Sequence, residues 1–318
     1  MIPRPGPLLR GALSVALVAT IVWWAGAEDI LALLVRASLP GLAAVILMHV
    51  GDRILMAYKW WRLLRARGYR VQLADAIRSY FLGSFVGAVM PIAGGADVAR
   101  IAALRGKGAS TENLISSVAL ERAIGAISHG FFCLAAVGLA VALSIDLEIS
   151  APMLGAAALA AVLALTLGLP LSFALASTIA ERFGGGTGLR GRIANLASDY
   201  AGWGRHPREL WIFLTLTFIE GFYPILTYYV AAQALGVETT LVQMAIAVPL
   251  AFLIPRLPIP MPSFGIEQGA FVYVAMQLGV GKEGAAAVTF LFLGTLLIAF
   301  APGAVAWFNT GARDRAPD

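Results

Sequence analysis

The apolar positions of this chain form long runs separated by short polar stretches, a pattern that predicts membrane-spanning helices. About 20 residues suffice to cross a bilayer, and six runs are long enough. These runs cover residues 8–27, 39–57, 113–143, 152–179, 209–235 and 284–308. The pattern therefore predicts an all-α polytopic membrane protein with about six full spans.

Two further apolar runs break in the same way. Residues 79–100 read SYFLGSFVGAVMPIAGGADVAR, and residues 247–271 read AVPLAFLIPRLPIPMPSFGIEQGAF. Each run is too short to span, stops at Pro and Gly, and is followed by an acid that opens a new apolar helix. An irregular backbone at membrane depth is tolerated only inside protein or along a cavity, and paired interruptions in two halves point to a binding site. We predict two re-entrant helical hairpins, at 74–106 and 240–279.

The basic residues orient the chain. Most of its 23 Lys and Arg residues lie in loops that are cytoplasmic if both termini are inside. The first hairpin then enters from the cytoplasm and the second from outside, which is the inverted-repeat pattern of many carriers. We therefore predict a single membrane domain, 1–318, with a first half at 39–180 and a second half at 207–310. The largest group of basic loop residues is Lys59, Arg62, Arg65, Arg67, Arg70 and Arg78.

Composition limits the function classes. Hydrophobic residues make up 59% of the chain and charged residues 13%, which indicates an integral membrane protein and leaves no linker or tail for a soluble catalytic domain. The loop asymmetry explains the net charge of +5, so we expect no nucleic-acid partner. One cysteine, Cys133, and three scattered histidines exclude a disulfide framework and His/Cys ligand spacing, so we expect no cofactor.

Three segments have structural roles predicted from their composition. Residues 187–205 have apolar residues at helical spacing among arginines and are predicted to form an interfacial amphipathic helix. The N-terminal run resembles a cleaved signal peptide, but its length and the membrane segment after it favour a retained first helix. Tryptophans near span ends are predicted to form an interfacial belt. These are Trp23, Trp24, Trp60, Trp61, Trp211 and Trp307.

Charges deep in the spans are candidates for function. Glu121 lies roughly 16 Å into its helix, Arg122 follows it, and Glu220 lies roughly 17 Å into another span. Charges at this depth cost several kcal/mol unless they are paired or hydrated. Adjacent helical residues point about 100° apart, so Glu121 and Arg122 are expected to have different partners. Arg122 could bind a lipid phosphate and Glu121 a cation or a proton. The alternative is a buried structural pair with Asp52, Arg53 or Glu220.

The acid after the first hairpin turn lies beside a possible anion site. The free N–H groups of a helix N-terminus favour a phosphate, and Arg100 could add a bidentate fork. Gly94 and Gly95 would let the backbone approach the ligand. The alternative is that Asp97 only caps this helix.

The second hairpin repeats this arrangement of charges. Arg256 and Glu267 bracket PIPMPSFG and could form an outer counterpart of the first site, or merely pair across the hairpin. The candidate substrate-binding residues are Gly94, Gly95, Asp97, Arg100, Glu121, Arg122, Glu220, Arg256 and Glu267.

These motifs resemble a known family. The run WWRLLRARG, then Pro91, Gly94-Gly95, Asp97, Arg100, Ser117 and Glu121-Arg122, and later PSFGIEQGAF, are similar to the flippase-like transmembrane region of the lysylphosphatidylglycerol synthases. The resemblance covers roughly residues 53–302. Two departures are Ala96, which interrupts the Gly-Gly-acid run, and Ser263-Phe264, where paired glycines are common. Because the soluble aminoacyl-transfer domain is absent, the resemblance implies lipid translocation and not lipid synthesis.

The leading hypothesis is translocation of an anionic phospholipid, or of a phosphate-linked isoprenoid or glycolipid, across a prokaryotic inner membrane. A second hypothesis is an intramembrane transferase with a polyprenyl-phosphate donor, although the chain shows no DxD-type acid cluster, HExxH motif or nucleophile elbow. A third is a non-transporting partner of an envelope biosynthesis enzyme. The expected partners are a membrane lipid, a second copy of the chain in a homo-oligomer, and a lipid- or glycan-modifying enzyme.

Overall fold

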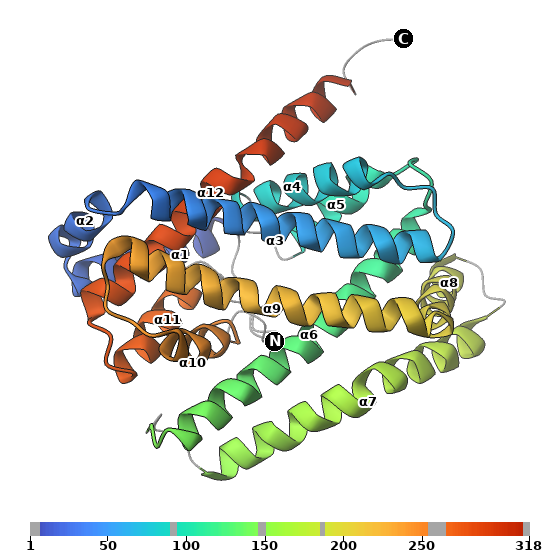
Figure 1. Cartoon of the computed structure of the whole chain (residues 1–318). Helices are drawn as coiled ribbons and strands as arrows, with labels where there is room; N and C mark the ends of the chain where they lie inside the picture. Colours follow the sequence, from blue (N-terminus) through green and yellow to red (C-terminus); the bar gives the residue numbers. More distant parts are fainter. Residues whose placement is uncertain (1–6, 90–93, 146–150, 185–187, 254–264, 314–318) are drawn as a thin grey trace.

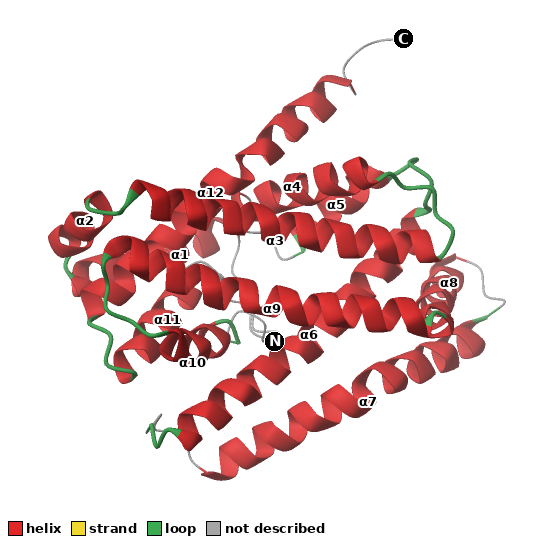
Figure 2. Cartoon of the chain, in the orientation of Figure 1, coloured by secondary structure: helices red, strands yellow, loops and turns green. Residues whose placement is uncertain are grey.

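The structure is a computed structural model that describes residues 7–89, 94–145, 151–184, 188–253 and 265–313. In these residues the secondary structure is helical, without a strand, which confirms the all-α class (Figure 2). The helices are α1 (Pro7–Ala25), α2 (Ala27–Val35), α3 (Leu39–Ala66), α4 (Leu73–Val89), α5 (Gly95–Leu104), α6 (Thr111–Ala142), α7 (Ala151–Phe183), α8 (Gly188–Gly202), α9 (Pro207–Leu235), α10 (Leu241–Ala251), α11 (Ile266–Gln277) and α12 (Lys282–Arg313), with a short 3-10 turn at Trp203–Arg205.

Four helices of the described chain are long and apolar enough to cross a membrane. They are α3, α6, α9 and α12, and each corresponds to one predicted span, with α6 ending one residue before the predicted end at residue 143. The predicted span 8–27 is different, because α1 ends at Ala25 and the chain bends by 86° at Gly26 into α2; this bent pair is a fifth candidate. The predicted span 152–179 lies in α7, whose 33 residues extend roughly 50 Å.

Polar residues at the helix starts explain where several long helices begin. The side chain of Ser38 accepts a hydrogen bond from the Gly41 N–H at the start of α3, and Ser110 does the same for Asn113 at the start of α6. Such caps satisfy N–H groups that have no partner inside the helix. A reciprocal capping box between Thr240 and Gln243 starts α10.

Both predicted hairpins contain pairs of short helices that pack side by side (Figure 1). The helices α5, α10 and α11 have 10, 11 and 12 residues, so each extends less than about 20 Å, well short of a hydrocarbon core of about 30 Å. Close packing of α4 on α5 depends on Gly83, where a Cβ atom would lie 2.6 Å from the Ala96 carbonyl oxygen. The connections at 90–93 and 254–264 lie outside the described residues.

The order long, short, short, long occurs twice in the chain. The helices α3, α4, α5 and α6 form the first set, and α9, α10, α11 and α12 form the second. The two sets pack crosswise, since α3 packs on α9, α4 on α12, and α10 on α6 (Figure 1). Each hairpin is therefore supported by the last long helix of the other set, and the two halves interlock.

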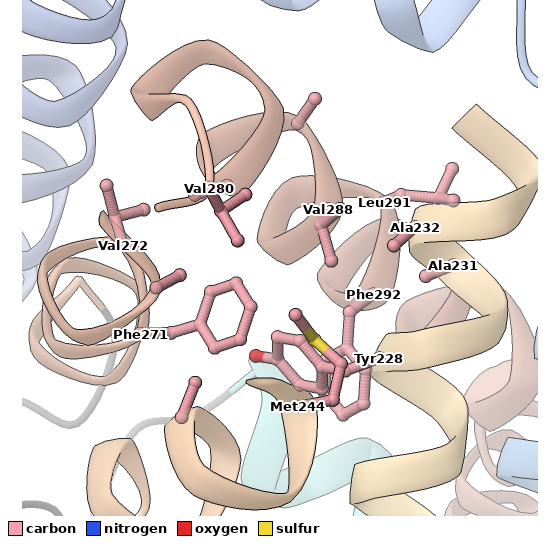
Figure 3. Packing of buried hydrophobic residues seen from close by; sticks show 14 of the residues in the cluster. Tyr228, Ala231, Ala232, Met244, Phe271, Val272, Val280, Val288, Leu291 and Phe292 are labelled. Carbon is pink, nitrogen blue, oxygen red and sulfur yellow. The ribbon is translucent and has the colours of Figure 1, made fainter. Parts of the chain in front are cut away.

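An aromatic cluster forms the core of the second set. The Tyr228 ring lies 4.4 Å from Phe271 and 4.3 Å from Phe292 between ring centroids, so α9, α11 and α12 meet there. Figure 3 shows Met244 of α10 beside these rings. The Tyr228 hydroxyl bonds to the hydroxyl of Thr289 at 3.1 Å, which satisfies a polar group inside this apolar core.

Many large apolar side chains are exposed on the outer helix faces. A water-soluble monomer rarely has such extensive apolar surface, whereas lipid chains solvate it well. The predicted tryptophan belt is wrong at Trp60, which is fully buried, and stays a prediction for the other tryptophans. Exposed examples are Leu47, Leu171, Ile298, Trp23, Trp24, Trp211 and Trp307.

The predicted amphipathic segment 187–205 corresponds to α8 and the following 3-10 turn. Leu189 and Ile193 are exposed, whereas Trp203 is fully buried. The Arg67 guanidinium, just after α3, lies 4.8 Å from the Trp203 ring and 3.5 Å from the Asp199 carboxylate. This segment is thus fixed to the end of α3 and presents a partly apolar outer face.

Close packing of α12 on α4 predicts the effect of adding one methyl group. A Cβ at Gly303 would overlap the Phe81 carbonyl oxygen, whereas a Cβ at Gly294, on the same helix, would meet no atom within 4 Å. Gly303→Ala should therefore lower the free energy of unfolding by about 1–3 kcal/mol, as overpacking does. Gly294→Ala should leave it unchanged or raise it by up to about 1 kcal/mol. Thermal unfolding of both variants in detergent checks this packing, and equal melting temperatures would contradict it.

Candidate functional site

A buried ion pair joins the first hairpin to α6. The Arg100 guanidinium of α5 donates two hydrogen bonds to the Glu121 carboxylate of α6, at 2.9 and 3.0 Å. The two side chains are only 4% and 7% exposed, so neither charge has much access to solvent. Because an unpaired charge in such surroundings is very unfavourable, each partner depends on the other.

Aromatic side chains enclose this pair. The Tyr80 hydroxyl donates to Glu121 at 2.6 Å and accepts a hydrogen bond from Arg100. The guanidinium lies 4.9 Å from the Trp60 ring and 4.6 Å from the Tyr80 ring, at distances suited to cation–π attraction. The Trp60 N–H donates in turn to Ser117 of α6 at 2.9 Å. Helices α3, α4, α5 and α6 are thus connected through one polar centre.

A second arginine, Arg122, binds Asp97 and is much more exposed than Arg100. The Nε and Nη2 groups of Arg122 donate to both oxygens of Asp97 at 2.9–3.1 Å. Asp97 also lies 2.9 Å from Arg100, so two arginines share this carboxylate. The Arg122 side chain is 66% exposed, in contrast to the buried Arg100. Four of the predicted site residues therefore meet in one network.

The alternative in which Asp97 only caps its helix is wrong. Gly94 occupies the N-cap position with φ 77°, in the left-handed region that suits glycine, and α5 begins at Gly95. Asp97 lies within the first turn, and its oxygens receive the arginine hydrogen bonds described above. Its role in this structure is that of a counter-ion.

Glu220 forms an ion pair with Lys59, a residue that the sequence analysis assigned to a cytoplasmic loop. Lys59 lies within α3, is almost fully buried, and forms an ion pair with Glu220 of α9. Its ammonium also donates to Thr217 at 3.1 Å and lies 5.0 Å from the Phe213 ring. The loop assignment of Lys59 is corrected by these contacts, because α3 continues to Ala66.

The alternative partners proposed for the deep charges are also corrected. Glu121 and Arg122 have different partners, as expected, but these are Arg100 and Asp97. Asp52 and Arg53 pair with each other in the middle of α3. This contact shows that a long arginine side chain can reach its neighbour's carboxylate despite the angle between adjacent residues.

The start of α11, in the second hairpin, repeats the backbone arrangement found at the start of α5. Gly265 precedes α11 with φ 90°, and Glu267 lies half-buried in the first turn, as Asp97 does after Gly94. Helix α11 packs mainly on α1, α10 and α12, whereas α5, which carries Arg100, packs mainly on α4 and α6. Arg256 lies outside the described residues, so the predicted outer site stays a prediction.

The sequence patterns did not reveal Tyr80, and they misplaced Lys59 and Trp60. The sequence did contain a signal that the helix continues past residue 57, because Ala57, Trp60 and Leu64, all buried, keep the helical spacing of 39–57 to the end of α3. Tyr80 offered no comparable signal, since its role depends on two partners that are distant in the sequence. Among the described residues no three His, Cys, Asp or Glu side chains converge as a metal site requires. The contacts that the structure describes at this site are ion pairs, hydrogen bonds and cation–π contacts.

Comparison with known proteins agrees with these observations. The chain matches the lysylphosphatidylglycerol synthase TM region family over residues 11–303, which includes every element of the network. The chain belongs to this family. It is also 29% identical over 79 residues to the UPF0104 membrane protein PH1989 of Pyrococcus horikoshii, and this match covers 25% of the chain and 24% of that protein. No solved structure matches it.

The two arginines of this family member should differ in their effect on stability. Arg100→Met leaves Glu121 without its cation, and breaking a buried pair costs about 3–5 kcal/mol. Arg122→Met leaves Asp97 paired with Arg100, so the loss should stay below about 1 kcal/mol, as for an exposed pair. Melting temperatures in detergent measure the difference. Adding Glu121→Leu to Arg100→Met should restore part of the stability, whereas equal losses for the two arginine variants would contradict the unequal roles of Arg100 and Arg122.

Proposed function

We propose that the chain moves a lipid with a phosphate-bearing headgroup between the two leaflets of a prokaryotic cell membrane. The observation that carries this proposal is the exposed Arg122–Asp97 pair, which lies roughly 17 Å along α6 from Thr111. An arginine at such depth is costly unless an anion or water accompanies it. Asp97 supplies the anion in this structure, and a lipid phosphate offers the same planar, bidentate match to the guanidinium.

The repeated helix order supports transport. Carriers with inverted repeats place their binding site at the repeat interface, beside discontinuous helices. Of the ion pairs described here, Lys59–Glu220 joins α3 to α9 across the two sets, and the Arg100–Glu121 pair lies beside it within the first set, where α5 packs on α6. The distribution of Lys and Arg favours cytoplasmic termini, with the first hairpin entering from the cytoplasm and the second from outside.

The transport test uses liposomes that contain the purified protein and a fluorescent lipid. We expect labelled phosphatidylglycerol in the inner leaflet to become accessible to an impermeant quencher, whereas a labelled glycosylceramide, which has no phosphate, should stay protected. Exchange of phosphatidylglycerol no faster than in protein-free liposomes would contradict the proposal. Arg122→Ala should abolish exchange without loss of folding, and Arg122→Lys should recover little, since an ammonium lacks the planar fork.

Arg62 provides a matched control for the loss of an arginine. It pairs with Glu209 at 3.0 Å, but it lies near the end of α3, away from Asp97. Arg62→Ala should keep lipid exchange near the wild-type rate. A folded Arg122→Ala protein that exchanges lipid at the wild-type rate would exclude Arg122 from the site.

The membrane orientation is testable by thiol labelling in a Cys133→Ser background. A cysteine at the exposed Glu238, between α9 and α10, should react with an impermeant reagent in intact cells. A cysteine at the exposed Arg192 of α8 should react only after the cells are opened. The opposite pattern would reverse the topology, and with it the sides from which the hairpins enter.

A further inference from the structure

Asp97 holds the guanidinium of Arg122 as a bound anion would. Both carboxylate oxygens lie within 2.9–3.1 Å of the Nε and Nη2 groups, in the side-on fork that arginine forms with planar anions. Every side-chain hydrogen bond that the structure describes for Arg122 goes to this carboxylate. Any other anion that binds through this fork must therefore displace Asp97.

The carboxylate would not lose all of its counter-charge on displacement. Arg100 lies 2.9 Å from Asp97 and is itself fixed by Glu121 and Tyr80. Arg100 is 4% exposed and Arg122 is 66% exposed, so an incoming headgroup meets Arg122 first. The two arginines are thus unequal: Arg100 is a fixed partner and Arg122 is an exchangeable one.

We propose that Asp97 is an internal substitute for the substrate phosphate. In the empty protein Asp97 neutralises Arg122. When the substrate binds, the phosphate oxygens replace Asp97 on the Arg122 guanidinium, and Arg100 keeps Asp97 in place. Asp97 is then a specificity-determining residue that competes with the ligand and does not contact it. This inference rests on the proposed function and identifies the ligand chemistry as a phosphate oxyanion.

The decisive variant is Asp97→Asn, which keeps the size of the side chain and removes its charge. If Asp97 competes with the ligand, the variant should bind a phosphate headgroup about 5-fold more tightly, since an exposed ion pair is worth up to about 1 kcal/mol. The gain should disappear in the double variant Asp97→Asn/Arg122→Ala, because it acts through Arg122. Unchanged or weaker binding by Asp97→Asn would overturn the proposal.

Asp75→Asn is a matched control on the same hairpin. Asp75 pairs with the exposed Lys107 at 2.6 Å, so this substitution also frees a cation near the surface. It should leave the affinity for the headgroup at the wild-type value. An equal gain in Asp75→Asn would show that any released positive charge attracts the probe, and this result would also overturn the proposal.

The measurement is titration calorimetry on the full chain in neutral detergent, with dihexanoyl phosphatidylglycerol and inorganic phosphate as separate probes. A gain in affinity for the lipid alone identifies a headgroup site, and a gain for both probes identifies a general phosphate site. Either result supports the replacement of Asp97 by phosphate on Arg122. Lipid exchange by the wild-type protein is measured in parallel. Exchange without a binding gain in Asp97→Asn overturns this inference alone, whereas a binding gain without wild-type exchange overturns the transport proposal alone.

Discussion

The buried pair of Arg100 and Glu121 is the interaction on which the rest of the site depends. It fixes a ten-residue helix against a spanning helix, at a place where neither charge could remain alone. Tyr80 and Trp60 bring α4 and α3 to the same centre. With α5 held in this way, Asp97 lies opposite Arg122, so the geometry of the exposed pair follows from that of the buried one.

The two halves share an order of helices but not a chemistry. The second half is packed around Tyr228, Phe271 and Phe292, which interact through ring packing and one hydrogen bond between hydroxyl groups. The first half is held by charges whose partners lie on different helices. Dispersion contacts among rings are individually weak and tolerate small shifts, whereas a buried ion pair requires specific geometry. We therefore expect the first hairpin to tolerate small structural shifts less well than the second.

Sequence patterns predicted the long helices, and the short helices on either side of the two interruptions, because helix length and Gly/Pro interruptions are local properties. The cost of burying charge also pointed to Glu121 and Arg122, of which the structure buries Glu121 and leaves the Arg122 side chain 66% exposed. The pairing itself could not be predicted, since Arg100 and Glu121 are 21 residues apart and meet only after α5 folds back on α6. Lys59 was misplaced because the positive-inside rule assigns a lysine near a span end to the loop, whereas Glu220 retains it inside the bundle.

A shared carboxylate solves a problem that any carrier of anions meets in a membrane. When the binding site is empty, an arginine inside the membrane needs a protein anion as its partner. Once the substrate has replaced that anion, the anion needs a cation of its own. Asp97 lies between Arg122 and Arg100, and Arg100 is retained by Glu121 whichever partner Arg122 has. In the proposed exchange, Arg122 has Asp97 as its anion before loading and the phosphate after it, and Arg100 keeps Asp97 paired in both states. An arginine alone would satisfy only the loaded state.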